Sequence, residues 1–333
     1  MRLDSVRSLK VDLFESMIAP LAWSSVMRSA GLRAQPTADL AATPPTFALG
    51  VAPAGKGDFA LAVRVQKRAL EEGPHVEAIR KKAKGEVDVR YIGLAVKRAA
   101  IPWQQKTTRP LRVGASIGHY KITAGTLGCF VRERSDGSPR ILSNNHVLAN
   151  ENRARKGDPI LQPGAFDGGR NPEDKVGEYL RSVRLQRSRP NLVDAALASI
   201  DADIEFNARA LTGIGKLAGL GDPLLDDGGE VRKIGRTTGK TTGVVTAFEL
   251  DGVLVRFDIG VLSFDNQLEI EGVGDKPFSL GGDSGSLIVD SGRRGVGLLF
   301  AGSDLGGTNG KGLTFANPLP AVLDALKVDL DLA

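Results

Sequence analysis

Cysteine is almost absent from this chain of 333 residues, which contains only Cys129. One thiol excludes a disulfide within the chain. Chains without disulfides are typical of a reducing compartment, so we expect a cytoplasmic location. The apolar neighbours Leu127 and Phe130 favour a buried, unreactive thiol over a reactive one.

Long apolar runs are also missing. No run reaches the roughly 18 residues that a membrane-spanning helix requires, and residues 17–23 are too short and too broken for the apolar part of a secretory signal. The formal net charge of +5 is small beside 44 basic and 39 acidic residues. Such a small excess does not indicate nucleic-acid binding. We therefore expect no membrane span and no nucleic-acid partner.

Aromatic residues make up only 5% of the chain, whereas glycine, with 41 residues, has about twice its usual share. Abundant glycine and few aromatics fit a turn-rich, mainly β chain. Histidine is scarce as well, since the chain has only His75, His119 and His146. Any chemistry that needs an imidazole therefore has few candidates.

The start of the chain predicts a helix followed by a linker. Apolar residues recur every three or four positions over residues 3–30, which indicates an amphipathic helix. Its polar face carries acidic as well as basic residues, so docking on its own domain is favoured over a membrane-surface helix. Residues 32–46 are rich in alanine, proline and threonine and are typical of a linker. We assign residues 1–46 to this helix and linker.

A small α/β domain is predicted next, over residues 47–105. The pattern indicates a strand at 59–65, a helix at 67–84 and a strand at 87–92. A strand, a crossover helix and a second strand form a βαβ unit with a parallel strand pair. The basic run at 80–84 is more typical of the solvated face of that helix than of a nucleic-acid site.

The stretch Phe278-Ser-Leu-Gly-Gly-Asp-Ser-Gly-Ser286 has the form of a nucleophile turn. Glycines around Asp283 and Ser284 permit a tight turn that points the amides of Gly282 and Ser284 into one concavity beside the Ser284 hydroxyl. Two such amides form an oxyanion hole. The alternative is an ordinary surface turn, which has the same composition.

A serine nucleophile needs a base and a carboxylate that orients the base. His146 follows an apolar strand that ends in small polar residues, and Asp194 is an acidic residue in an otherwise apolar segment. A buried carboxylate without a partner is costly, so Asp194 is expected to have one. His119 has no carboxylate near it in the sequence and is the weaker candidate for the base. The sequence therefore predicts His146, Asp194 and Ser284 as a triad.

Residues 111–328 resemble a trypsin-like serine peptidase of the chymotrypsin fold. The resemblance rests on the Ser-Asn-Asn-His-Val, Val-Asp-Ala-Ala-Leu and Gly-Asp-Ser-Gly motifs, in the family's order, and on residues 231–239, which resemble the segment that opens the second barrel in bacterial members. Non-secreted bacterial members and plant narrow-leaf proteins are the most similar branch. The resemblance implies two six-stranded antiparallel β-barrels over residues 106–333, preceded by the N-terminal α/β extension.

The resemblance also implies a serine endopeptidase that acts on a protein or peptide through an acyl-enzyme intermediate. An endopeptidase of this kind needs no metal and no cofactor. Secreted zymogens of the family form the oxyanion turn when a new N-terminus pairs with the aspartate equivalent to Asp283; no activation site is visible here, so Asp283 must have another partner. The alternatives are a catalytically silent binding module, and a protease that cleaves itself or is switched on by a regulatory partner through residues 1–105.

Substrate-binding residues follow from the same resemblance, which places the floor of the specificity pocket six positions before the nucleophile, at Phe278. Its walls are expected from Ser279 and from Phe300, Ala301 and Gly302. This pocket is apolar and favours cleavage after small or medium apolar residues. In the alternative, Phe278 points into the barrel core and Asp304 reaches the pocket.

The run Gly235-Arg-Thr-Thr-Gly-Lys-Thr241 also resembles a phosphate-binding P-loop. A P-loop has four residues between its glycines and a helix after them, but this run has three, and residues 244–248 have the pattern of a strand. We therefore reject nucleotide binding and expect a hairpin that closes at residues 250–253.

Overall fold

The computed structural model describes residues 1–18, 47–92, 100–225 and 229–333. These residues form two compact units, Met1–Ala99 and Ala100–Ala333, each with its own hydrophobic core. Among the described residues, no helix has both the length and the apolar character needed to cross a membrane.

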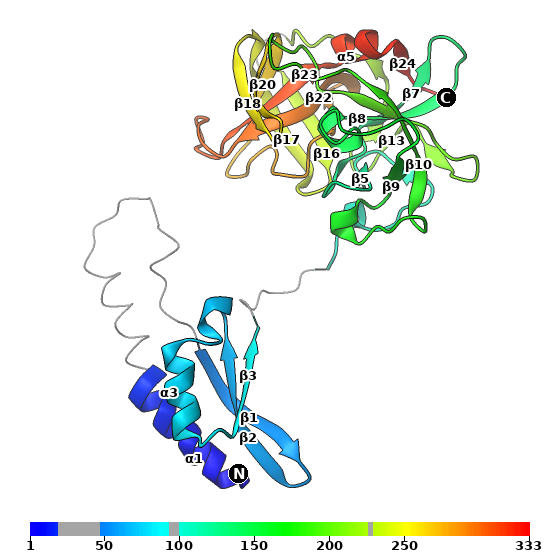
Figure 1. Ribbon diagram of the computed structural model, residues 1–333. Coiled ribbons are helices and arrows are strands. Elements are labelled where there is room, and N and C mark those ends of the chain that lie inside the picture. The colour runs from blue at the N-terminus through cyan, green and yellow to red at the C-terminus, as the bar shows by residue number, and fades with distance from the viewer. Residues whose placement is uncertain (19–46, 93–99, 226–228) are drawn as a thin grey trace. The chain divides into compact units, whose positions relative to one another are not determined.

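The N-terminal unit is a three-stranded sheet with the strand order β1-β2-β3 (Figure 1). β1 (Phe47–Gly55) and β2 (Asp58–Val65) form an antiparallel hairpin, and β3 (Val87–Tyr91) lies parallel to β2. α3 (Pro74–Lys82) connects the parallel pair, with the short 3-10 helix η3 before it, at Arg68–Leu70. The predicted βαβ unit is therefore present, and β1 adds a strand that the sequence pattern did not predict.

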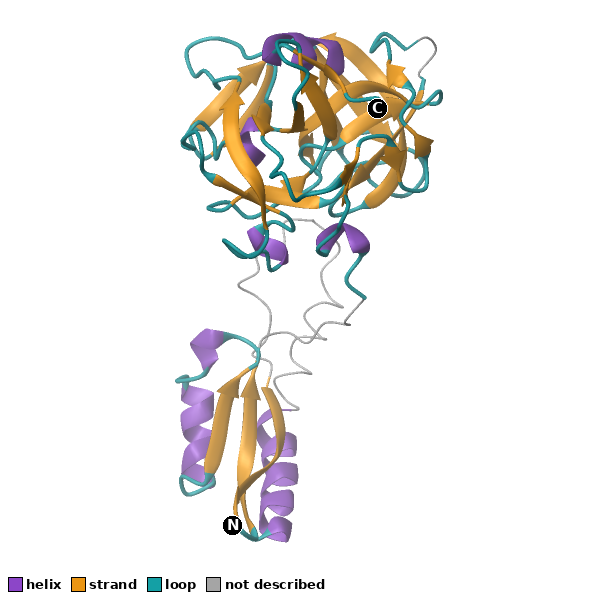
Figure 2. Cartoon of the chain, turned by 90° about the vertical axis from the view of Figure 1, so that its right-hand side faces the viewer, coloured by secondary structure: helices purple, strands orange, loops and turns teal. Residues whose placement is uncertain are grey.

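The predicted N-terminal helix is α1 (Leu3–Leu13), continued by one π-helical turn, η1 (Phe14–Ile18). Val6 and Leu13 are fully buried in the same core as the strands and α3. Figures 1 and 2 show α1 and α3 along the sheet. The helix is therefore docked on its own unit. The rest of the predicted helix and the linker at 32–46 lie outside the described residues.

The first part of the C-terminal unit is an open antiparallel sheet. Its edge strands, β24 (Val328–Leu330) and β6 (Gly125–Thr126), are not paired with each other within the described part of the chain. β24 pairs with β7 on the side of β7 that faces away from β8. A strand that closed this sheet into a barrel would have to pair at that same edge. The other strands, in order from β24, are β7 (Cys129–Glu133), β8 (Pro139–Ser143), β11 (Ala196–Ala198), β10 (Lys175–Ser182), β9 (Pro159–Leu161) and β5 (Ser116–His119).

The second part is a closed six-stranded antiparallel barrel, because its last strand pairs again with its first. Its strands, in order around the barrel, are β22 (Arg294–Ser303), β21 (Leu287–Asp290), β16 (Glu230–Gly235), β17 (Gly239–Leu250), β20 (Gln267–Gly272) and β23 (Leu313–Pro318). The predicted fold class, mainly β with two barrel-like sheets and an N-terminal α/β extension, is confirmed. The difference is that one barrel is closed and the other is a half-barrel.

Smaller elements complete the C-terminal unit. α5 (Leu319–Leu326) is the predicted closing helix, and its apolar side chains join the largest core. The hairpin predicted to close at 250–253 is wrong in its pairing. β17 does end at Leu250, but it pairs with β16 and β20, while β18 (Val253–Phe257) pairs with β19 (Gly260–Phe264). The remaining short strands are β4 (Leu111–Arg112), β12 (Phe206–Asn207), β13 (Ala210–Leu211), β14 (Gly215–Lys216) and β15 (Gly219–Leu220).

Two 3-10 helices flank the site described below. η4 (Trp103–Gln105) belongs to the C-terminal unit, because Trp103 packs against its core and Gln105 Nε2 donates to the Arg236 carbonyl at 3.2 Å. η5 (Ala165–Asp167) lies in the loop between β9 and β10.

Candidate active site

His146 and Asp194 are in direct contact. His146 lies on the short helix α4 (Asn145–Leu148), directly after β8, and Asp194 lies just before β11, which pairs with β8. His146 Nδ1 is 2.5 Å from Asp194 Oδ2, and the His146 amide donates to Asp194 Oδ1 at 3.3 Å. The strand pairing therefore brings together two residues that lie far apart in the sequence.

Asp194 is fully buried, and other side chains fix its backbone. Its amide donates to Asn317 Oδ1 at 2.9 Å, and its carbonyl accepts from Asn144 Nδ2 at 2.7 Å. Asn317 Nδ2 in turn donates to Gln267 Oε1 at 2.6 Å. A strand of the closed barrel therefore positions the aspartate of the half-barrel.

The pKa of His146 is raised above its ordinary value of 6.5. Burial alone would lower it, because burial disfavours the imidazolium. The charge of Asp194, its hydrogen bond and the charge of Glu151 together outweigh burial. His146 keeps 22% of its side-chain surface exposed, and the residue lines a cavity. The imidazole is a base with a stabilised conjugate acid.

Ser284 lies in the turn before β21 and lines the same cavity as His146, a space of about 510 Å³. Ser284 Oγ is 3.5 Å from the Phe300 carbonyl oxygen, at the long limit of a hydrogen bond. Among the described residues, no hydrogen bond joins Ser284 to His146. Such contacts are often long in an unliganded enzyme and shorten when substrate binds.

The amides of Gly282 and Ser284 are free to bind an oxyanion, since within the described part of the chain neither donates a hydrogen bond. Both of the preceding carbonyls are held. The Gly281 carbonyl accepts from Thr237 Oγ1 at 2.7 Å, and the Asp283 carbonyl accepts from the Ser286 amide at 3.0 Å. The C=O and N–H of a trans peptide point in opposite directions, so both amides face away from these partners.

Gly282 shows why this turn requires glycine. Its φ is +94°, and an added Cβ would lie 2.5 Å from Arg236 Nη1 and 2.6 Å from Thr237 Oγ1. Side chains at this φ are strained, and here one would also collide with both neighbours. The predicted tight turn therefore depends on this residue.

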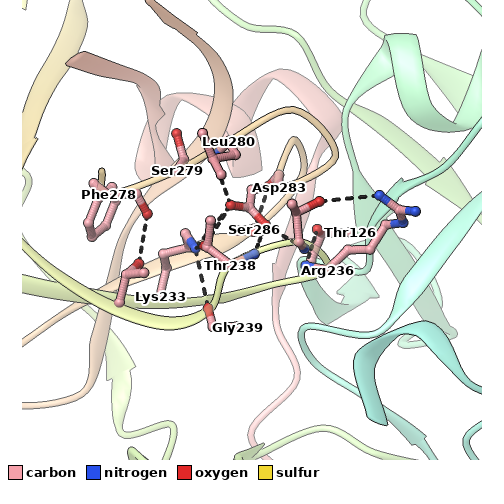
Figure 3. Close-up of polar contacts among 12 residues, drawn as sticks. Thr126, Lys233, Arg236, Thr238, Gly239, Phe278, Ser279, Leu280, Asp283 and Ser286 are labelled. Carbon is pink, nitrogen blue, oxygen red and sulfur yellow. Dashed lines mark hydrogen bonds and ion pairs between the residues drawn. The ribbon is translucent and has the colours of Figure 1, made fainter. Parts of the chain in front are cut away.

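Asp283 has the partner that the sequence left open: Lys233, whose Nζ is 3.2 Å from Asp283 Oδ2 (Figure 3). Both side chains are fully buried. Thr238 Oγ1 donates to the same carboxylate oxygen at 2.7 Å, and the amides of Thr237 and Thr238 donate to the other at 2.8 and 3.1 Å. Asp283 is therefore paired with an ammonium group from within the described chain.

Of the predicted substrate-binding residues, one lies in the core and the others line cavities. Phe278 is only 1% exposed and packs in the core of the closed barrel, so it lines no pocket. Phe300 contributes to the cavity shared by His146 and Ser284. A second cavity of about 270 Å³ lies beside Ser284, and its lining includes Ser279, Ala301, Gly302, Ser303 and Asp304.

Phe278 is therefore corrected from pocket floor to core residue. Its backbone carbonyl accepts from Thr241 Oγ1 at 2.8 Å, and its ring packs in the core of the closed barrel. Asp304 lines the second cavity, as in the alternative derived from the sequence. The cavity beside Ser284 therefore has a carboxylate on its lining, and Phe278 does not line it.

The other residues considered from the sequence have structural roles. His119 is buried with Nε2 3.0 Å from Asp158 Oδ2, and its Nδ1 accepts from the Lys121 amide, so neither nitrogen is free to act as a base. Burial raises the pKa of the Cys129 thiol to about 12, which fits an unreactive cysteine. Residues 236–238 form the β16–β17 turn, and a strand rather than a helix follows them.

Several residues of the site were not predicted from the sequence. Thr126 joins the turn to the half-barrel, because its hydroxyl donates to the Gly282 carbonyl at 2.9 Å and its amide to the Ser284 carbonyl at 2.8 Å. The Glu151 carboxylate accepts from the amides of Asp258 and Ile259 beside the His146 cavity. Lys233 did carry a signal: it is a cation on the face of β16 that also carries the buried Val231.

No protein-family model matches this chain. A curated relative, Protein NARROW LEAF 1 from Oryza sativa subsp. japonica, is 29% identical over 214 residues, which is 57% of this chain and 36% of the relative. The chain therefore matches only about a third of that protein's length.

Solved structures similar to this chain include Cellulomonas bogoriensis chymotrypsin, with 20% identity over 66% of this chain and 98% of that one, and a TM-score of 0.45. An α-lytic protease homologue, N4, has 21% identity over 66% of this chain and 99% of that one, with a TM-score of 0.46. The comparisons thus return the two groups that the sequence motifs resemble: chymotrypsin-like serine proteases and a plant narrow-leaf protein.

Proposed function

We propose that this chain is a serine endopeptidase in which Ser284 is the nucleophile, His146 the general base and Asp194 the residue that orients the base. The observation that carries the proposal is the 2.5 Å contact between Asp194 and His146, together with the cavity that His146 and Ser284 both line. The free amides of Gly282 and Ser284 lie in the same turn as the nucleophile.

The reaction follows from these positions. Ser284 Oγ attacks the peptide carbonyl carbon while His146 Nε2 takes the hydroxyl proton, and the carbonyl oxygen becomes an oxyanion bound by the two amides. The tetrahedral intermediate breaks its C–N bond, and His146 gives the proton to the leaving amine. Water then attacks the Ser284 ester by the same steps in reverse, which releases the acid and restores the serine.

Asp194 contributes by fixing the tautomer and stabilising the imidazolium. Its carboxylate accepts a hydrogen bond from Nδ1–H, so Nε2 is left as the basic nitrogen. This role accounts for the burial of a carboxylate whose only side-chain partner among the described residues is the imidazole.

The substrate is a protein or a peptide, and we place the side chain before the scissile bond in the cavity lined by Ser279, Ala301 and Gly302. We also propose that residues 1–105 bind a regulatory partner. The cytoplasmic location remains a prediction from the single cysteine.

Peptide hydrolysis by the full chain and by Ser284→Ala tests the proposal. The variant removes one oxygen atom from a partly exposed turn, so the fold is expected to persist while turnover falls below about one part in 10³. Equal activity in both proteins would assign the hydrolysis to a different site. A folded wild-type chain without activity on a diverse peptide library would favour the silent binding module.

A further inference from the structure

The peptide unit between Gly281 and Gly282 is the part of the oxyanion hole with the least intrinsic rigidity. Both flanking residues are glycines, and a Cβ added at Gly281 would meet no atom within 4 Å. The bond is trans, yet the φ and ψ angles on either side are unrestricted by side chains. The peptide can therefore flip, and a flip would exchange the Gly282 N–H for the Gly281 carbonyl in the oxyanion hole.

One side chain holds this peptide in place. Thr237 Oγ1 donates to the Gly281 carbonyl at 2.7 Å, and within the described residues no other group bonds to that carbonyl. The peptide that precedes Ser284 differs, because its carbonyl is held from within the turn by the amide and hydroxyl of Ser286. Of the two peptide units that supply the amides, only the one before Gly282 has its carbonyl held by a side chain from a separate segment.

Thr237 is itself fixed. Arg236 Nη1 donates to the Thr237 hydroxyl oxygen at 3.2 Å, which leaves the hydroxyl proton for Gly281. The Arg236 guanidinium makes a bidentate pair with Asp167 at 2.5 and 2.6 Å, and both side chains are at least nine-tenths buried. The Thr237 amide also donates to Asp283. The hydroxyl is thus held rigidly from η5, by way of Arg236.

We propose that Thr237 is a positioning residue that keeps the Gly281–Gly282 peptide in the orientation that binds an oxyanion. This inference rests on the proposed function, and it assigns a role to the Gly-Arg-Thr-Thr-Gly run that resembled a P-loop. Thr237 acts through Gly282 and does not itself contact the reacting atoms.

Thr237→Val tests the inference, because valine keeps the shape of threonine and removes the hydroxyl. Loss of one whole oxyanion donor typically lowers kcat by about 10²–10³-fold. A peptide that flips only part of the time loses less, so we expect kcat to fall about 10–100-fold with KM nearly unchanged. Thr237→Ser restores the hydroxyl and is expected to recover most of the activity.

Inhibitors separate this role from a general structural one. A peptide boronic acid, which becomes tetrahedral on Ser284, is expected to lose affinity for Thr237→Val in parallel with kcat. A product peptide, which places no oxyanion in the hole, is expected to bind as tightly as before. The matched control is Thr241→Val, which removes a hydroxyl bond to the Phe278 carbonyl of the same loop and is expected to leave the ratio of the two affinities unchanged.

Crystal structures of the wild type and Thr237→Val give a readout that does not require activity. We expect the Gly281–Gly282 peptide to be flipped or present in both orientations only in the variant. The inference is overturned if the variant retains the wild-type orientation, or if its kcat and boronate affinity equal those of Thr241→Val. An inactive wild type would instead count against the proposed function, and the crystal structures would still decide the role of Thr237.

Discussion

Replacing Lys233 by methionine should destabilise the C-terminal unit by about 3 kcal/mol. Removing one member of a buried ion pair typically costs about 3–5 kcal/mol, because the other charge stays buried without compensation. Asp283 would keep four donors, from the amides of Thr237, Thr238 and Leu280 and from the Thr238 hydroxyl. These donors place the expected loss at the lower end of the range.

Urea unfolding provides the measurement. The chain has two tryptophans, and Trp103 packs against the core of the C-terminal unit, so replacing Trp23 by phenylalanine makes the fluorescence specific to that unit. Lys276→Met, at an exposed lysine, is the matched control and should change stability by less than about 0.5 kcal/mol.

A second substitution tests whether the uncompensated charge of Asp283 causes the loss. Adding Asp283→Asn removes the buried charge and should recover part of the loss. A Lys233→Met variant within about 1 kcal/mol of the wild type at pH 7 would refute the reasoning, because the pair would then not compensate two buried charges.

The remaining predictions concern catalysis. Burial lowers the pKa of Lys233 below 10.5 despite the charge and hydrogen bond of Asp283. Because Lys233 holds Asp283 in the turn that carries Ser284, kcat/KM should fall at a pH below 10.5 as Lys233 loses its proton. A flat alkaline profile would contradict this role. Because the pKa of His146 is raised, the acidic limb of kcat/KM should have its midpoint above pH 6.5, and a midpoint below that value would count against His146 as the base. Glu151→Gln removes one of the charges that raise this pKa and should move the limb to lower pH, whereas an unmoved limb would show that Glu151 does not act on His146. Asp304→Asn should lower cleavage after Lys or Arg by about fivefold relative to cleavage after apolar residues, since an exposed carboxylate contributes up to about 1 kcal/mol; a digest already dominated by apolar residues in the wild type would restore the apolar pocket.

The sequence was sufficient to place the three candidate catalytic residues in one region. His146, Asp194 and Ser284 each lie at the end or start of an apolar strand, and the pairing of those strands determines which of their ends meet. The positions where strands begin and end were predictable as well, because a run of alternating or apolar residues that is bounded by glycine has few possible structures other than a strand. Element types are local properties, and most of those predicted are present.

Features that depend on distant contacts could not be predicted in this way. Phe278 follows a proline and precedes a polar residue, so nothing local distinguishes a pocket floor from a core position, and its packing against distant strands of the closed barrel decides it. The closure of only one barrel depends on β24, which comes from the far end of the chain and covers the edge of β7.

The residues that hold the turn around Asp283 were not predicted from the sequence. Lys233 and Thr237 lie more than forty residues before Asp283 and reach it only because β16 pairs with β21. A lysine on the buried face of a strand was a visible irregularity, but its partner was not identifiable without the strand register. The Gly-Arg-Thr-Thr-Gly run resembles segments of other proteins, but its physical role comes from the contacts of Thr237 with the turn that carries Asp283.

The most direct test of the central claim, that Ser284 is an activated nucleophile, is labelling of the full chain with a fluorophosphonate. We expect one adduct per chain by intact mass at pH 8, located on Ser284 by peptide mapping, and no adduct in Ser284→Ala or His146→Ala. A folded wild-type chain that takes up no label, or takes it up on another residue, would contradict the account.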